Sequence, residues 1–430
     1  MIVRENQHLH QILTRGNILF LIGVFLLPSA LAFSILFLLI SLIYSLSSIN
    51  FSKRENYSIL VLLSVGLIFL STFINTIINV PQELISYNKQ TIWLNLFNWV
   101  PFVLICWGFR NYLVDIKQKI IFAKILISGT IPVLISCILQ LWFGLDNGPY
   151  STLNGILIWF QYPIEEVGSL TGLFSNQNIT GMWLCINLAL SLGLIKEEKN
   201  KISKYFLIAI SGLSIYFIFL TNSRNAVIGL LIAIFLSTGL KKSFLILLST
   251  LSGFFLTNVF HILLKNSNLQ LIPTRLLNKL TFSYSFFEDR FIIWREALDL
   301  ILIRPLSGWG GSTFSFLFPN NEIGFPAYHT HNMAIELAYS FGIPVSILIM
   351  IFIYKLTRKC YKKIFASNNL DPINIFNKSW FICFVIIVIC HTTDMTFFDG
   401  RISIVLAILI SGLVNLVNKP LEIKNKDIGL

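Results

Sequence analysis

The sequence predicts an all-α polytopic membrane protein. Of its 430 residues, 55% are hydrophobic and only 12% are charged, whereas about a quarter of the residues of a typical soluble domain are charged. Apolar runs of about 20 residues, the length that crosses a bilayer core as a helix, recur along the whole chain. We therefore expect a single integral membrane domain over residues 1–430, with about 12 transmembrane helices.

Most of the expected spans are single apolar runs, but the first run, 17–47, is too long for one span and contains Pro28. Two short spans that break near Pro28–Ser29 would keep the N-terminus, with Arg4 and Arg15, on the cytoplasmic side. We expect this arrangement, with both termini cytoplasmic. The other expected spans are 57–79, 91–109, 120–143, 176–195, 203–220, 225–240, 242–260, 332–354, 378–394 and 402–417.

The distribution of basic residues predicts the orientation of the chain. The net charge of +12 is compatible with nucleic-acid binding, but most Lys and Arg residues lie in short clusters at every second loop, as cytoplasmic loops do. We therefore expect contacts with membrane lipids and none with nucleic acid. The clusters that mark the cytoplasmic side are 53–54, 110–124, 196–204, 241–242, 355–363 and 419–426.

The loops on the opposite side contain basic residues that this orientation does not explain. The loop 144–175 has no Lys or Arg, and it carries Asp146, Glu165 and Glu166. The largest loop, 261–331, holds several arginines. Because positive charge on the outer side opposes the topology signal, these arginines are candidates for function.

The segment 288–305 of the largest loop is amphipathic and ends at Pro305, so we expect an interfacial helix with Trp294 at headgroup level. Two of its arginines, Arg290 and Arg295, are five residues apart and point about 140° apart on a helix. We expect Arg290 to face a site, because Arg295 has carboxylates beside it on the same helix. The glycines of "LSGWGGSTF" (306–314) permit tight turns. They are compatible with a functional loop and with an ordinary structural loop.

His329 and His331 precede an apolar stretch, and three interpretations of them stay open. They are interfacial residues that cap a span, or metal ligands together with His391 or Asp394, or a general base. The start of a helix disfavours imidazolium, so a neutral ring there can accept a proton. The cysteines have no spacing typical of zinc sites or disulfide frameworks.

Arg224, in the turn "TNSRNA", is either a snorkelling interfacial arginine or an anion clamp, because a guanidinium fork matches phosphate oxygens. In the last outer turn, "HTTDMTFFDGRIS", we expect Asp394, Asp399 and Arg401 to form a structural ion pair.

Several motifs together resemble the O-antigen ligase and O-antigen polymerase superfamily. "RFIIWREALDLILIRPLSGWGGSTF" followed by "HTHNMAIELAYSFGIP" is similar to its signature of an Arg, a Trp four residues on, a glycine turn and a His-Asn pair. "TGLFSNQNITGMWL" (171–184) resembles its Gly-x-Phe-x-Asn-x-Asn segment, and "TNSRNAVIGLL" resembles its Ser-Arg turn. The likeness is strong over about residues 170–345.

The resemblance implies an inverting GT-C type glycosyltransferase in the bacterial inner membrane that needs no metal, nucleotide or other cofactor. It would transfer a glycan from an undecaprenyl-diphosphate donor to a lipid-linked or lipid A–core acceptor on the periplasmic side. The superfamily pattern places the diphosphate at Arg224 and Arg290, and the acceptor base at His331, with His329 able to share that role. Arg295 and Asn332 complete the expected substrate-binding set.

A small-anion transporter, bicarbonate-like and with Arg224 as its site, is the alternative function. Transporters carry ionisable groups near mid-span and often show internal repeats. Here the charges gather at the outer ends of the expected spans, and no repeat is visible. We therefore favour the transferase.

Overall fold

A computed structural model describes residues 2–46, 56–78, 89–143, 150–152, 157–159, 169–239, 242–245, 248–249, 252, 285–318, 327–365 and 372–418. Most of the predicted span 242–260 lies outside these residues. So do the basic clusters 53–54 and 419–426, and the acidic residues Asp146, Glu165 and Glu166.

The first long apolar run forms two helices, α1 (Ile2–Leu26) and α2 (Leu31–Leu46), as predicted. The break falls at the residues around Pro28, which has no backbone N–H to continue a helix. The two helices pack closely, because Ser34 donates a hydrogen bond to the Gly23 carbonyl at 2.7 Å and Ser41 to the Gly16 carbonyl at 2.8 Å. Small residues of this kind allow close approach of membrane helices.

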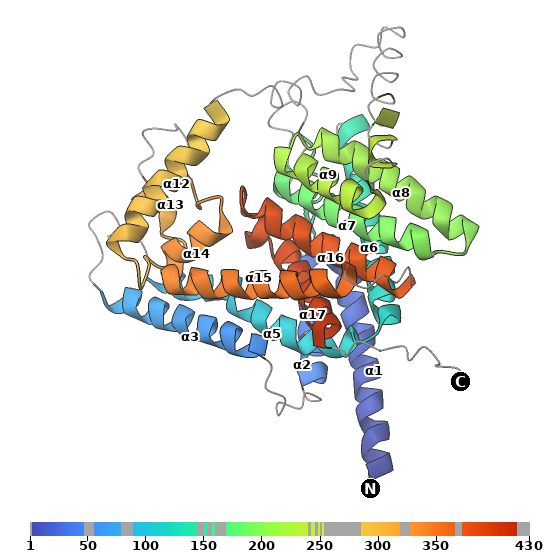
Figure 1. Cartoon of the computed structure of the whole chain (residues 1–430), viewed down its shortest axis with the longest axis horizontal. Helices are drawn as coiled ribbons and strands as arrows, with labels where there is room; N and C mark the ends of the chain where they lie inside the picture. The colour runs from blue at the N-terminus through green and yellow to red at the C-terminus, as the bar shows by residue number, and fades with distance from the viewer. Residues whose placement is uncertain are drawn as a thin grey trace, which may run out of the picture.

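Helix α7 (Gln177–Glu197) is buried along most of its length and packs against α6, α8, α9 and α16. Figure 1 shows α12, α13 and α14 together on one side of the molecule and α7, α8 and α9 on the other. The remaining helices are α3 (Asn56–Ile77), α4 (Gln90–Leu94), η2 (Asn95–Asn98), α5 (Val100–Gly108), η3 (Phe109–Tyr112), α6 (Ile116–Trp142), α8 (Lys201–Leu220), α9 (Arg224–Thr238), α12 (Ser285–Ile303), α13 (Phe314–Leu317), α14 (Met333–Phe341), α15 (Ile343–Phe365), α16 (Pro372–Cys390), η4 (Thr396–Phe398) and α17 (Gly400–Asn418).

Six helical stretches within the described residues are long and apolar enough to cross a membrane. They are Ile59–Ile77, Gln90–Tyr112, Ile116–Trp142, Gln177–Glu197, Lys201–Leu220 and Gly400–Asn418. The shorter apolar helices Leu13–Leu26, Leu31–Leu46, Arg224–Thr238 and Ile375–Cys390 accompany them. The chain is thus an α-helical, multi-pass membrane protein, and the total of 12 spans stays a prediction.

The predicted span 332–354 is wrong, because the chain breaks at Gly342 into the short helix α14 and the long helix α15. Gly342 has φ +94°, a conformation open to glycine, and a Cβ there would lie 2.2 Å from the Leu306 carbonyl oxygen. The next amide, Ile343 N–H, donates to the Pro305 carbonyl at 2.8 Å. Packing against the 305–306 segment therefore ends α14 after Phe341.

The glycine segment after α12 has a structural role. The amides of Trp309 and Gly310 donate to the Tyr339 and Ser340 carbonyls at 2.8 and 2.9 Å, which satisfies acceptors in the last turn of α14. Gly308, at φ +63°, permits this approach, because a Cβ there would lie 2.6 Å from the Tyr339 carbonyl oxygen. The interpretation as an ordinary structural loop is therefore supported.

A short antiparallel hairpin, β1 (Tyr150–Thr152) with β2 (Leu157–Trp159), lies in the predicted outer loop 144–175. The expectation of an all-α fold did not include it. The rest of the described secondary structure is helical.

Candidate functional site

The two histidines converge in the loop that leads into α14. Their ring centroids are 4.1 Å apart, and the His331 amide lies 3.3 Å from Nδ1 of His329. His331 has φ +55°, in the left-handed region that an L-residue rarely adopts. Such a backbone costs about 1–3 kcal/mol and persists where the surrounding contacts impose it. Local strain of this kind is common at functional sites.

Asp394, in the turn between α16 and η4, is the partner of His331. Its Oδ1 lies 3.1 Å from Nδ1 of His331, and it also accepts the Met395 amide at 2.9 Å. Both side chains are largely covered, with 21% of His331 and 9% of Asp394 exposed. The pair brings together residues 63 positions apart in the sequence.

The environment favours an ionised Asp394 beside a neutral His331. Burial lowers the pKa of His331, and the hydrogen bond to Asp394 raises it. The effect of burial is larger, so the pKa lies below its ordinary value. Burial raises the pKa of Asp394, but the hydrogen bond from His331, the charge of a protonated His331 and the charge of Arg290 outweigh this effect, so the pKa lies below its ordinary value. A carboxylate only accepts, so Nδ1 carries the His331 proton and Nε2 can accept one.

The predicted ion pair of Asp394, Asp399 and Arg401 is correct for the last two residues and wrong for Asp394. Arg401 Nε donates to Asp399 Oδ1 at 2.9 Å, and both side chains are buried. Arg401 also donates to the Leu173 carbonyl at 3.1 Å and lies 4.2 Å from the centre of the Phe174 ring. Arg401 therefore links the segment 171–176 to the turn that carries Asp399.

A polar pocket of about 330 Å³ opens beside the histidines. It brings together three stretches that are distant in sequence: the segment before and at the start of α7, the histidine loop, and the turn 394–399. Asn176 caps α7 by accepting the Asn178 amide at 2.7 Å. The pocket is lined by Ser175, Asn176, Asn178, Ile179, His329, His331, Asp394, Met395, Thr396, Phe398 and Asp399.

Arg224 and Arg290 lie on two other helices and are not among the residues that line this pocket. Arg224 is the first residue of α9, after the N-cap Ser223, whose side chain accepts the Ala226 amide at 3.2 Å. Burial lowers the pKa of Arg290 on α12, Asp394 raises it, and the charge of Arg224 lowers it further. Arg290 therefore lies within electrostatic range of both residues. Arg295, on the same helix, is exposed.

Residues 209–350 match the family model described as O-antigen ligase. This match supports the predicted resemblance to the O-antigen ligase and polymerase superfamily. The matched region runs from α8 into α15 and contains Arg224, Arg290, His329 and His331. Comparison with the curated proteins gives no significant match.

Proteins of the O-antigen ligase family are glycosyltransferase-like ligases or polymerases that act on lipid-linked glycans in a membrane, so the match does not favour the transporter. Asp394 lies outside the matched residues. Sequence reasoning missed it as the partner of His331. The available signal was a carboxylate in a turn that also contains two aromatic residues, because a carboxylate buried there would need a partner.

Two residues of the superfamily motifs have structural contacts that the sequence did not predict. The indole N–H of Trp294 donates to the Thr330 carbonyl at 2.9 Å, so the side chain contacts the histidine loop. Its position at headgroup level stays a prediction. Asn332 is the N-cap of α14, accepting the amides of Ala334 and Ile335. A role of Asn332 in substrate binding stays a prediction.

The metal site suggested for His391 is not assembled in the described part of the chain, where no group of three or more His, Cys, Asp and Glu is placed to hold a metal ion. His391 is buried, and its Nε2 lies 3.0 Å from the Thr396 hydroxyl. The six cysteines are free thiols.

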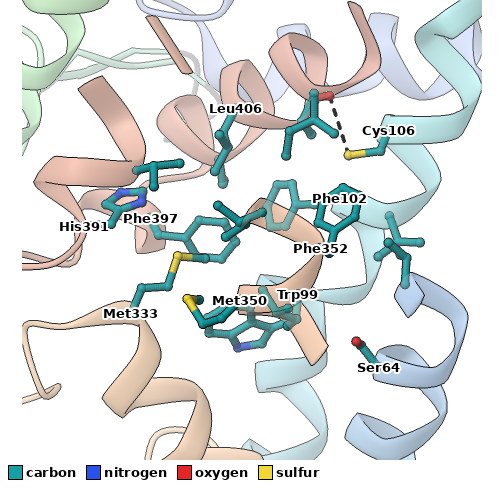
Figure 2. Close-up of a pocket in the computed structure, with 18 of the residues that line it drawn as sticks. Ser64, Trp99, Phe102, Cys106, Met333, Met350, Phe352, His391, Phe397 and Leu406 are labelled. Carbon is teal, nitrogen blue, oxygen red and sulfur yellow. Dashed lines mark hydrogen bonds between the residues drawn. The ribbon is translucent and has the colours of Figure 1, made fainter. Parts of the chain in front are cut away.

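A second, apolar cavity of about 280 Å³ lies among α3, α5, α15, α16 and α17, adjoining the turn that carries Asp394. Figure 2 shows His391 and Met333 on one side of it, and Cys106 and Ser64 on the other. Its lining extends along α17 from Ser403 to Val414, a rise of about 17 Å. That length is close to half of a bilayer core about 30 Å thick.

Proposed function

We propose that this chain transfers a glycan from an undecaprenyl-diphosphate donor to the hydroxyl of a lipid-linked or lipid A–core acceptor. The observation that carries the proposal is the His331–Asp394 pair, which lines a polar pocket within electrostatic range of Arg290. A neutral imidazole oriented by a carboxylate is suited to general-base catalysis. Arginines match the charge that develops on a departing diphosphate.

In the proposed step, the acceptor hydroxyl gives its proton to Nε2 of His331 while its oxygen bonds to the anomeric carbon. The bond from that carbon to the diphosphate oxygen breaks, and its electron pair leaves on the diphosphate. Arg224 and Arg290 stabilise the leaving charge, and Asp394 holds the imidazole in the required tautomer and stabilises the imidazolium. His329 can share the role of base. Its pKa is lowered mainly by burial and further by the charge of a protonated His331.

The proposal places the reaction on the periplasmic side of the inner membrane, with residues 261–331 as a large periplasmic loop of a single membrane domain. The distribution of basic clusters supports this orientation. The apolar cavity supports a lipid-linked substrate, because a hydrocarbon chain fits a lining of this length and composition. The exposed apolar residues Phe291, Leu298 and Leu302 on α12 support contact of that helix with lipid.

The test is transfer in vitro between a defined lipid-diphosphate donor and acceptor, with donor binding measured separately. His331→Ala should abolish transfer and leave donor binding largely intact, because the arginines hold the donor. Arg224→Lys should reduce transfer by roughly 10²–10³-fold, because lysine keeps the charge and loses the planar fork. Full activity of His331→Ala would remove the base from the mechanism.

The same assay separates the base from a metal site. The proposed reaction is insensitive to a chelator, and His329→Ala should be less damaging than His331→Ala, because Asp394 orients only the latter ring. Inactivation by EDTA, together with equal damage from both histidine variants, would contradict a metal-independent mechanism.

A further inference from the structure

Thr330 lies between the two histidines of the site and is bonded through each of its polar groups. It is fully buried. Its amide donates to Glu336 Oε2 at 2.9 Å, and its carbonyl accepts the Trp294 indole N–H at 2.9 Å. Its hydroxyl donates to the Asn332 carbonyl at 3.0 Å. The peptide groups on both sides of this residue are therefore fixed.

The two side chains that hold Thr330 come from different helices. Trp294 is on α12, one turn after Arg290, and Glu336 is on α14. Glu336 is buried, and its second oxygen accepts the Ser340 hydroxyl at 3.1 Å. The helices α12 and α14 share a small apolar cluster. Thr330 is thus the point where the helix of Arg290 meets the loop of the histidines.

The neighbouring residue His331 needs such restraint. Its φ of +55° is a conformation that an isolated chain leaves readily, and it persists where contacts on either side impose it. The Asp394 bond at 3.1 Å restrains the imidazole ring, and the bonds at Thr330 restrain the backbone that presents it. Without those backbone bonds, the ring would move relative to both Asp394 and Arg290.

We propose that Glu336 and Trp294 are positioning residues that clamp Thr330 and thereby fix the base His331 relative to Arg290 and Asp394. This inference rests on the proposed function for the roles of His331 and Arg290. The clamp acts through geometry, and a displacement of about 1 Å in a catalytic group can cost roughly 10²-fold in rate.

The experiment uses substitutions that remove single bonds from the full-length protein. Trp294→Phe keeps an aromatic ring and removes the indole N–H. Glu336→Ala removes both acceptor oxygens, whereas Glu336→Gln keeps an oxygen for the Thr330 amide and a donor for Ser340. The matched controls are Trp93→Phe, which loses an exposed indole bond to Thr76, and Glu296→Gln on α12.

Two readouts distinguish positioning from general destabilisation. Trp294→Phe and Glu336→Ala should each lower kcat by about 10- to 100-fold, while KM for the donor changes by no more than about twofold. Glu336→Gln should retain most of the wild-type kcat. Hydrogen exchange of the peptide 327–333 should become faster in Trp294→Phe and Glu336→Ala. Both controls should behave as the wild type in each measurement.

Unchanged kcat in Trp294→Phe and Glu336→Ala, while His331→Ala is inactive, would overturn the clamp and leave the proposed function intact. Equal damage from Glu336→Gln and Glu336→Ala would also overturn it, because the amide retains the hydrogen bonds. If the wild type transfers no glycan from any lipid donor, the proposed function fails. Exchange of 327–333 then decides the clamp alone, and unchanged exchange in both variants overturns it.

Discussion

Replacing Asp394 by asparagine tests the arrangement of the base most directly. An asparagine amide can donate to Nδ1 of His331, which would place the imidazole proton on Nε2 and block that nitrogen as a base. The bond replaced is a 3.1 Å contact between two largely covered groups. Hydrogen bonds to charged groups contribute about 1.5–3 kcal/mol, equivalent to roughly 10- to 150-fold in rate, and the wrong tautomer adds to this loss.

The pH dependence gives the same substitution a second, independent readout. The wild-type rate should fall as pH falls through the lowered pKa of His331, because the protonated ring cannot accept a proton. Asp394 raises that pKa against the effect of burial, so Asp394→Asn should lower it further. The acidic limb of kcat/KM should therefore move to lower pH while the maximal rate falls.

The assay is a pH series of initial transfer rates with a defined donor and acceptor, with Asp299→Asn, an exposed carboxylate on α12, as the control. Donor binding by Asp394→Asn should stay close to that of the wild type. Wild-type activity in Asp394→Asn, or an acidic limb that stays in place or moves to higher pH, would refute the reasoning about the pair.

The remaining predictions concern the anion clamp, the break before α15 and the orientation. Arg290→Lys should lose roughly 10²–10³-fold in rate and Arg295→Lys much less, and the opposite ranking in the transfer assay would mean that the other face of α12 meets the substrate. Gly342→Ala should destabilise the fold by at least about 1–3 kcal/mol in thermal unfolding, because its φ of +94° and the close Leu306 carbonyl exclude a Cβ. A cysteine replacing the exposed Tyr328 should react with an impermeant thiol reagent from outside in a cysteine-free background, and one replacing Asn200 should not; the reverse pattern would invert the topology.

The helices of this protein could be predicted from local sequence, because hydropathy over about 20 residues is a property of the chain itself. The ranges of α6, α7 and α8 lie within a few residues of the predicted spans. The break between α1 and α2 was also local, since Pro28 removes a backbone donor. The resemblance through short motifs likewise depended on residues that are close together in the chain, and the family match over residues 209–350 supports it.

The arrangement of the site required the tertiary structure, because its decisive contacts join residues that are far apart in the chain. Hydropathy predicted one span over 332–354. In the structure, the carbonyls of Pro305 and Leu306 pack against the chain at Gly342, and this segment is divided into α14 and α15. The sequence allowed Asp394 to pair with Arg401. In the structure, the turn after α16 packs against the histidine loop, and Asp394 therefore contacts His331, whereas Arg401 pairs with Asp399. Local sequence determines which residues enter a membrane helix, whereas the partner of a buried charge depends on which helix ends meet.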